Sequence, residues 1–120
     1  MKFSFEIKTV PGGVREINLF GKILIPEDFT PLKEKIDELL ELKNRKFILN
    51  LEEVEQMNSS GLNLIINLLT KIRNKGGELL IIHAEGSVRK LFEISKLTKV
   101  FKIYNSKEEA VNELNKLNNE

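Results

Sequence analysis

The segment Asn58-Ser59-Ser60-Gly61 has the residue types for serine chemistry at the predicted start of a helix. The first turn of a helix presents unpaired N–H groups and a partial positive charge, so it favours an anion. A phosphate on Ser59 would add about 1.5 to 2 negative charges and three acceptor oxygens there. In a partner's interface the same group would be a bulky, hydrated charge, and this combination suits a phosphorylation switch. Ser and Asn are also the commonest helix N-caps, so capping alone is the alternative.

Other residues with chemical potential lack the neighbours that their chemistry needs. His83 is the single histidine, and the Gly-x-Ser-x-Gly elbow of serine hydrolases is absent. Gly76-Gly77 is not part of a Gly-x-x-x-x-Gly-Lys phosphate loop. Glu52, Glu53 and Glu55 have no His or Asp at ligand spacing, so we interpret them as solvated loop charges. We therefore expect no enzyme activity, no catalytic residue, no metal site and no cofactor.

Composition fits one soluble domain over residues 1–120. Nineteen basic and eighteen acidic residues are interspersed, so we expect no direct binding of nucleic acid. The absence of cysteine excludes disulfides and thiol catalysis. The N-terminus lacks the unbroken apolar stretch of a signal peptide. The apolar stretch Leu62–Leu69 is far shorter than the ~20 residues that span a bilayer, so we expect no membrane insertion and a cytoplasmic location.

Hydrophobic periodicity predicts a β-hairpin followed by a helix. Two strands are indicated by alternating apolar residues, with the turn at Pro11-Gly12-Gly13 and with Gly21 closing the second strand. The apolar positions of these strands are Phe3, Phe5, Ile7, Ile17 and Leu19. The first helix has Thr30 as its expected N-cap and Pro31 at its first position. Its core stripe is Leu32, Ile36, Leu39 and Leu40.

The remaining elements alternate between strands and helices. The expected strands are 47–51, 79–82 and a short edge strand 100–104, and residues 52–57 are expected to form a loop. The second helix runs from Ser59 or Ser60 to about Asn74 and ends at Gly76-Gly77. A third helix covers 87–94. The last helix follows a capping box at Ser106–Glu109, and its apolar face is Ala110, Val111, Leu114 and Leu117.

The predicted fold is an α/β domain in the order ββαβαβα(β)α. It has a mostly parallel sheet of four to five strands, an N-terminal β-hairpin and about four helices. In open α/β sheets function gathers where loops leave the carboxyl ends of the strands. Here those loops are 21–29, 52–59 and 83–86, and the second of them leads into Ser59.

Leu64 and Leu68 lie off the main apolar stripe of the second helix, one turn apart and on the side of Gly61. Two interpretations are open. A neighbouring helix covers both leucines, or they form an exposed apolar ridge beside Ser59 that docks a partner and is disrupted by phosphorylation.

The segment Ile48–Leu62, which reads ILNLEEVEQMNSSGL, resembles the signature of the STAS family, typified by bacterial anti-sigma-factor antagonists. Further similarity lies at Gly21 and at 75–79, 88–92 and 97–101, so the resemblance covers nearly the whole chain. It implies a single STAS-like domain that catalyses nothing itself.

The resemblance also implies a partner switch. In the family, the unmodified antagonist binds an anti-sigma factor that is also a serine kinase, and a sigma factor is thereby released. The kinase uses ATP to phosphorylate the first serine of an Asp-Ser-Ser/Thr-Gly motif, and a PP2C-type phosphatase reverses this. Ser59 occupies the phosphorylated position. The residues expected to bind the partner are Asn58, Ser60, Gly61, Leu62, Leu64, Leu68, Gly21 and Lys22.

Two positions differ from the family pattern. Asn58 replaces the usual acidic residue before the serine, and Gly21-Lys22-Ile23-Leu24 stands where many antagonists have two acidic residues around an apolar one. These differences fit a second possibility, a non-catalytic STAS subunit of a transporter or stress-sensing complex whose serine is never modified.

Overall fold

The computed structural model describes residues 2–116. The elements, in chain order, are β1 (Ser4–Val10), β2 (Val14–Ile23), the 3₁₀ helix η1 (Pro26–Phe29), α1 (Thr30–Glu41), β3 (Lys46–Asn50), β4 (Val54–Met57), α2 (Ser59–Asn74), β5 (Glu78–Ile82), α3 (Gly86–Ile94), β6 (Ile103–Tyr104) and α4 (Lys107–Lys116). Within this part of the chain, none of the helices has the length and apolar character needed to cross a membrane.

One six-stranded sheet organises the structure, in the order β1-β2-β3-β5-β6, with β4 beside the end of β2. β1 is antiparallel to β2, and the other pairs are parallel. The α/β class, the mostly parallel sheet, the N-terminal hairpin and the four helices are therefore confirmed. The strand count is higher than expected because residues 54–57, which we predicted to be a loop, form β4.

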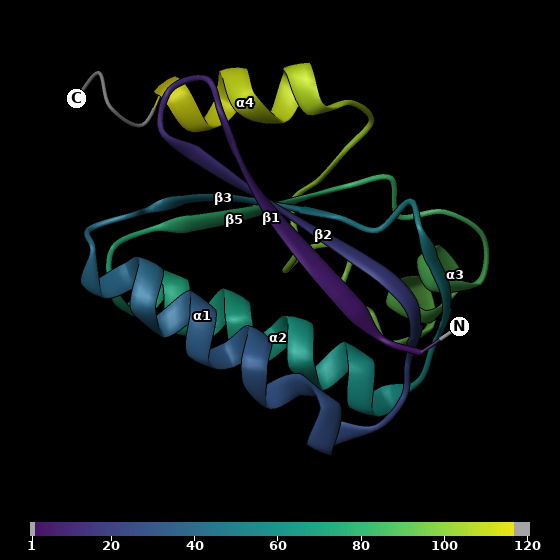
Figure 1. Ribbon diagram of the computed structural model, residues 1–120. Helices are drawn as coiled ribbons and strands as arrows, with labels where there is room; N and C mark the ends of the chain where they lie inside the picture. Colours follow the sequence, from purple (N-terminus) through teal and green to yellow (C-terminus); the bar gives the residue numbers. More distant parts are fainter. Residues whose placement is uncertain (1, 117–120) are drawn as a thin grey trace.

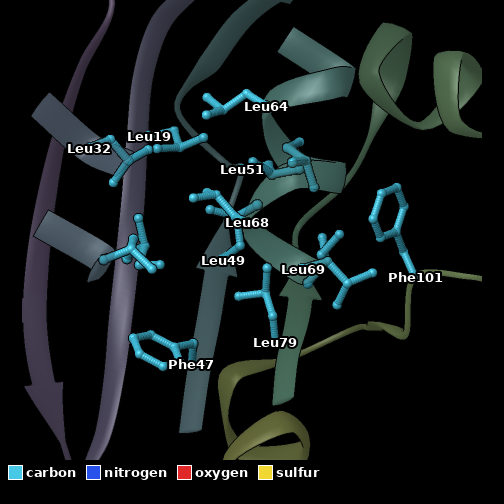
Figure 2. Packing of buried hydrophobic residues seen from close by; sticks show 14 of the residues in the cluster. Leu19, Leu32, Phe47, Leu49, Leu51, Leu64, Leu68, Leu69, Leu79 and Phe101 are labelled. Carbon is cyan, nitrogen blue, oxygen red and sulfur yellow. The ribbon is translucent and has the colours of Figure 1, made fainter. Parts of the chain in front are cut away.

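The helices lie on both faces of the sheet (Figure 1). α1 and α2 cover one face, where the main apolar cluster includes the side chains that Figure 2 labels: Leu19, Leu32, Phe47, Leu49, Leu51, Leu64, Leu68, Leu69, Leu79 and Phe101. α4 covers the other face with a smaller cluster formed by Val14, Ile48, Leu80, Ile82, Ala110 and Leu114. Because β3 and β5 are buried on both faces, they appear in the sequence as continuous apolar segments.

Three boundaries differ from the sequence prediction. Gly21 does not close β2, because the strand continues to Ile23 and the register with β4 shifts between Gly21 and Lys22. Gly21 has a φ of 84°, which a residue with a Cβ rarely adopts, so it bends the strand instead of ending it. Thr30 is the first residue of α1, not its N-cap, because η1 leads directly into the helix. The edge strand β6 includes only Ile103 and Tyr104 of the predicted segment 100–104.

Other local predictions are confirmed. Both glycines of the hairpin turn have positive φ, 85° at Gly12 and 73° at Gly13. α2 ends before Gly76-Gly77. At the start of α4 the Ser106 hydroxyl accepts a hydrogen bond from the Glu109 N–H at 3.2 Å. The predicted core residue Leu117 lies outside the described residues.

Candidate functional site

Asn58 begins α2. It is in an extended conformation, and its Oδ1 accepts a hydrogen bond from the Gly61 N–H at 3.1 Å. Its backbone carbonyl accepts from the Leu62 N–H at 3.0 Å. The capping interpretation is therefore confirmed for Asn58 itself, and Ser59 is the first residue of the helix. Because Asn58 provides the cap, the exposed Ser59 side chain is not needed to satisfy the helix end.

The Asn58 side chain also links two loops. Its Nδ2 donates a hydrogen bond to the Leu24 carbonyl oxygen at 3.3 Å. An aspartate could still cap the helix, but its carboxylate could not donate to Leu24. Asparagine at this position therefore fastens the loop after β2 to the first turn of α2, a role that the sequence alone did not reveal.

Gly61 lies close against the end of β2. A Cβ at Gly61 would lie 2.5 Å from the Ile23 carbonyl oxygen and 2.7 Å from Met57 Cγ. Both contacts are shorter than real Cβ atoms tolerate, so only glycine fits without movement. The glycine thus positions the Ser59 turn against the ends of β2 and β4.

β4 brings the two predicted parts of the site together. Lys22 lies opposite Gln56, and Ile23 lies opposite Met57. The Gly21 N–H donates to the Glu53 carbonyl oxygen at 3.1 Å. Lys22 and the loop after it therefore lie beside the start of α2. β4, which we predicted to be a loop, is the element that places Lys22 and this loop beside α2.

The exposed-ridge hypothesis for Leu64 and Leu68 is wrong. The exposed fraction is 1% for Leu64 and 0% for Leu68, and both belong to the main core (Figure 2). Leu64 and Leu68 extend the apolar arc of α2 because this helix packs on α1 as well as on the sheet. Gly61 and Leu62 are buried too. The side chains that reach solvent here belong to Lys22, Asn58 and Ser59, with Ser60 half-buried.

Two surface hollows flank the loop between β2 and α1. One, of about 310 Å³, combines apolar and charged side chains, namely Lys2, Phe3, Lys22, Leu24, Ile25 and Asp28. The other, of about 200 Å³, lies between η1, α1 and α2 and is lined by Pro26, Phe29, Lys33, Ser60, Asn63, Leu64 and Asn67. Ile25 is 53% exposed in this loop. The surface around this loop therefore combines apolar side chains with the charged side chains of Lys2, Lys22, Lys33 and Asp28.

The first turn of α2 contains no acidic residue. The partial positive charge of this helix end is thus not neutralised by a carboxylate of its own turn. Lys33 lies in the same hollow as Ser60 and adds a full positive charge to the neighbourhood. The local electrostatics favour an anion, which agrees with the chemistry proposed for Ser59.

His83 lies in a hollow that does not include Ser59, whereas Glu53 and Glu55 lie next to the site, directly before β4 and within it. His83 lines a hollow of about 20 Å³ together with Glu85, Arg89 and Tyr104, and Ser59 is not among its lining residues. Residues 2–116 contain no group of three His, Asp or Glu side chains arranged to hold a metal ion.

An ion pair on the α4 face, between buried Glu16 and half-exposed Lys107, was not predicted. Glu16 is only 2% exposed, and its carboxylate receives Lys107 Nζ at 2.8 Å and Asn50 Nδ2 at 3.1 Å. Burial alone raises the pKa of Glu16, but the hydrogen bonds from Lys107 and Asn50 and the nearby positive charges lower it overall. Lys107 lies in the first turn of α4, where the helix dipole disfavours a cation, so the pair serves to hold α4 on the sheet.

A model of the STAS domain matches residues 9–110. The chain belongs to the STAS domain family. It is 30% identical over 84 residues to the anti-sigma F factor antagonist of Paenibacillus polymyxa. The matched region covers 69% of this chain and 72% of that protein. The resemblance inferred from the sequence is confirmed.

Solved STAS structures have the same fold. The NMR structure of TM1081, a Thermotoga maritima protein, matches with a TM-score of 0.81 and 26% identity over 95% of this chain and 90% of that one. Unphosphorylated SpoIIAA matches with a TM-score of 0.70 and 20% identity over 92% and 96% of the two chains. Anti-sigma factor antagonists are non-enzymatic, so the prediction that this STAS protein is not an enzyme is confirmed.

Proposed function

We propose that this STAS protein is an anti-sigma factor antagonist controlled by phosphorylation of Ser59. The unmodified protein binds an anti-sigma factor that is also a serine kinase, and phosphorylation of Ser59 ends that binding. A PP2C-type phosphatase restores the binding form. Binding, phosphorylation and dephosphorylation take place in the cytoplasm, where ATP is available to the kinase.

The observation that best supports this proposal is the position of Ser59. It is exposed and directly follows the capping residue, so the serine is accessible while Asn58 maintains the helix start. Within residues 2–116 no hydrogen bond holds the Ser59 hydroxyl, which leaves it available as a nucleophile toward the γ-phosphate of ATP.

A phosphate on Ser59 changes the surface more than the fold. At a helix N-terminus a negative charge is stabilising by about 0.3 to 1 kcal/mol, so α2 tolerates the modification. In an interface the same group brings nearly two charges that must lose their hydration. The expected effect of phosphorylation is therefore loss of the partner without unfolding.

The partner-binding surface that we propose consists of Lys22, Asn58, Ser59 and Ser60 together with the two hollows beside them. The other residues that we expected to bind the partner, Gly21, Gly61, Leu62, Leu64 and Leu68, are buried and are not part of this exposed surface. The name of the Paenibacillus polymyxa relative, an anti-sigma F factor antagonist, supports an anti-sigma factor as the partner.

A second candidate function is a non-catalytic subunit of a transporter or stress-sensing complex. Asn58 favours it, because the residue before the serine serves here to fasten the loop at Leu24 and has no charge for a kinase to recognise. In this case Ser59 is never modified, and the protein stays in one stable assembly.

Affinity purification from the native host separates the two functions. The variants are Ser59→Ala, Ser59→Glu and a control, Asn74→Asp, which adds one negative charge at the exposed far end of α2. We expect the wild type, Ser59→Ala and Asn74→Asp to retain an anti-sigma factor, identified by mass spectrometry, and Ser59→Glu to lose it. Equal retention by Ser59→Glu would contradict the switch. Equal recovery of an ATPase or transporter subunit by all four would favour the second candidate.

A further inference from the structure

The outer edge of β1 is unpaired in the described part of the chain. β1 is the first strand in the sheet order, and β2 is the only strand of residues 2–116 that pairs with it (Figure 1). Such an edge presents a row of free N–H and C=O groups that can accept another strand. The segment Ser4–Val10 contains no proline and keeps an unbroken register with β2, so nothing in it interrupts further pairing.

We infer that β1 is a self-association surface, which pairs antiparallel with β1 of a second copy of this chain. The two-fold axis passes between the two Ile7 residues, perpendicular to the sheet. In this register Ile7 faces Ile7, Glu6 faces Lys8 and Phe5 faces Thr9 of the second copy. The two sheets become one continuous sheet.

Charge complementarity favours this register over its nearest alternatives. Glu6 and Lys8 are both exposed and lie on the same side of β1 because side chains alternate along a strand. With the axis at Ile7, each Glu6 faces a Lys8, so two favourable cross-strand pairs form. A shift of the axis to Glu6 places two glutamates opposite each other, and a shift to Lys8 places two lysines opposite each other. Of the registers centred within Ser4–Val10, the one centred on Ile7 pairs the whole strand and also brings opposite charges together.

Apolar side chains on the opposite side of β1 favour the same pairing. Phe5 and Ile7 pack on the main core but remain partly exposed in the single chain. With the axis at Ile7, these side chains come beside Ile7 and Thr9 of the second copy. A two-fold axis perpendicular to the sheet keeps the α1 face of one copy beside the α1 face of the other, so apolar surface meets apolar surface. The interface is one strand wide, which fits a weak, concentration-dependent dimer.

Sedimentation equilibrium of the purified protein, from low micromolar to near-millimolar concentration, tests this inference. We expect a monomer–dimer equilibrium for the wild type. Glu6→Lys and Lys8→Glu each place like charges opposite each other twice, so each should be monomeric over the same range. The double variant Glu6→Lys/Lys8→Glu restores opposite charges and should dimerise again. The inference would be overturned by any of three results: the wild type stays monomeric, the single variants dimerise as the wild type does, or the double variant stays monomeric.

Oxidative cross-linking tests the register directly, because the chain has no cysteine of its own. Residues that face each other in antiparallel strands have Cα atoms about 4.5 to 5.5 Å apart, within disulfide range. Ile7→Cys should therefore form a disulfide-linked dimer under mild oxidation. The two Ser4 positions would lie about 20 Å apart, so Ser4→Cys is the matched control and should stay monomeric. Circular dichroism checks that both variants fold. Equal cross-linking of both variants, or none at Ile7→Cys in a folded protein, would contradict the proposed axis.

Discussion

Gly61→Ala should weaken the start of α2, although alanine is the better helix former. The new Cβ would lie 2.5 Å from the Ile23 carbonyl oxygen, which belongs to the backbone of β2. Ordinary contact begins at 3.4 Å, so the helix start or the strand must move by roughly 1 Å. Met57 Cγ, at 2.7 Å, is part of a flexible side chain and can rotate away more easily.

Two opposing effects set the magnitude. Replacing glycine by alanine within a helix gains about 1 kcal/mol. Overpacking a close contact costs typically about 1 to 3 kcal/mol. The net expectation is a free energy of unfolding lower by up to about 2 kcal/mol. Movement of the first turn also lengthens the 3.1 Å hydrogen bond from the Gly61 N–H to Asn58, which adds to the loss.

Urea unfolding followed by circular dichroism measures this difference. Asn63→Ala is a matched control, because Asn63 is an exposed residue of the same helix and should change stability by no more than about 0.5 kcal/mol. Stabilisation by Gly61→Ala of about 1 kcal/mol, the gain expected from helix propensity alone, would refute the close approach of α2 to β2.

Three further substitutions test other parts of the structure. Asn58→Asp keeps the cap and adds a favourable charge, so the free energy of unfolding should change by less than about 1 kcal/mol. Hydrogen exchange across residues 24–29 should nevertheless accelerate, because the hydrogen bond to the Leu24 carbonyl is lost. Unchanged exchange would show that this hydrogen bond does not hold the loop. Lys107→Ala removes the partner of Glu16 and should cost about 1 to 2 kcal/mol near neutral pH. The folded-state pKa of Glu16 is lowered from 4.5, so the stability that the ion pair contributes is present above that value and is lost as the pH falls through the folded-state pKa. In urea unfolding, the stabilities of the wild type and Lys107→Ala should therefore converge in acid. A stability difference independent of pH would contradict the role of this ion pair. Leu68→Ala, at a fully buried position, should cost about 2 to 5 kcal/mol in the same unfolding assay, and a neutral effect would contradict its place in the core.

Much of the fold was predictable because the apolar pattern is strong. β3 and β5 are short apolar segments and α2 has a clear helical stripe, so the bounds of each were predicted to within a residue or two, and the start of α1 was predicted equally well. β4 was missed for a physical reason. It is four residues long, its central residues Glu55 and Gln56 are exposed, and its pairing with β2 depends on a register shift at Gly21 that no local pattern announces.

The candidate site was predictable in outline but not in its contacts. The position of Ser59 at the start of a helix follows from Asn58 as a cap and from the apolar stripe that begins at Leu62. Burial of Leu64 and Leu68 could not be decided, because it depends on how α1 lies across α2. The bond from Asn58 to Leu24 and the ion pair of Glu16 with Lys107 join residues 34 and 91 positions apart, and such pairs have no signal in a single sequence.

Phosphorylation of Ser59 in the native host is the most direct test of the proposed function. The protein would be purified during growth and under stress, and its phosphorylated residues would be mapped by mass spectrometry, with Ser59→Ala as the control. The proposal predicts a phosphoryl group on Ser59 whose occupancy changes with conditions and which is absent from the Ser59→Ala variant. A Ser59 that stays unmodified in every condition, in a protein that co-purifies with one stable complex, would contradict the switch.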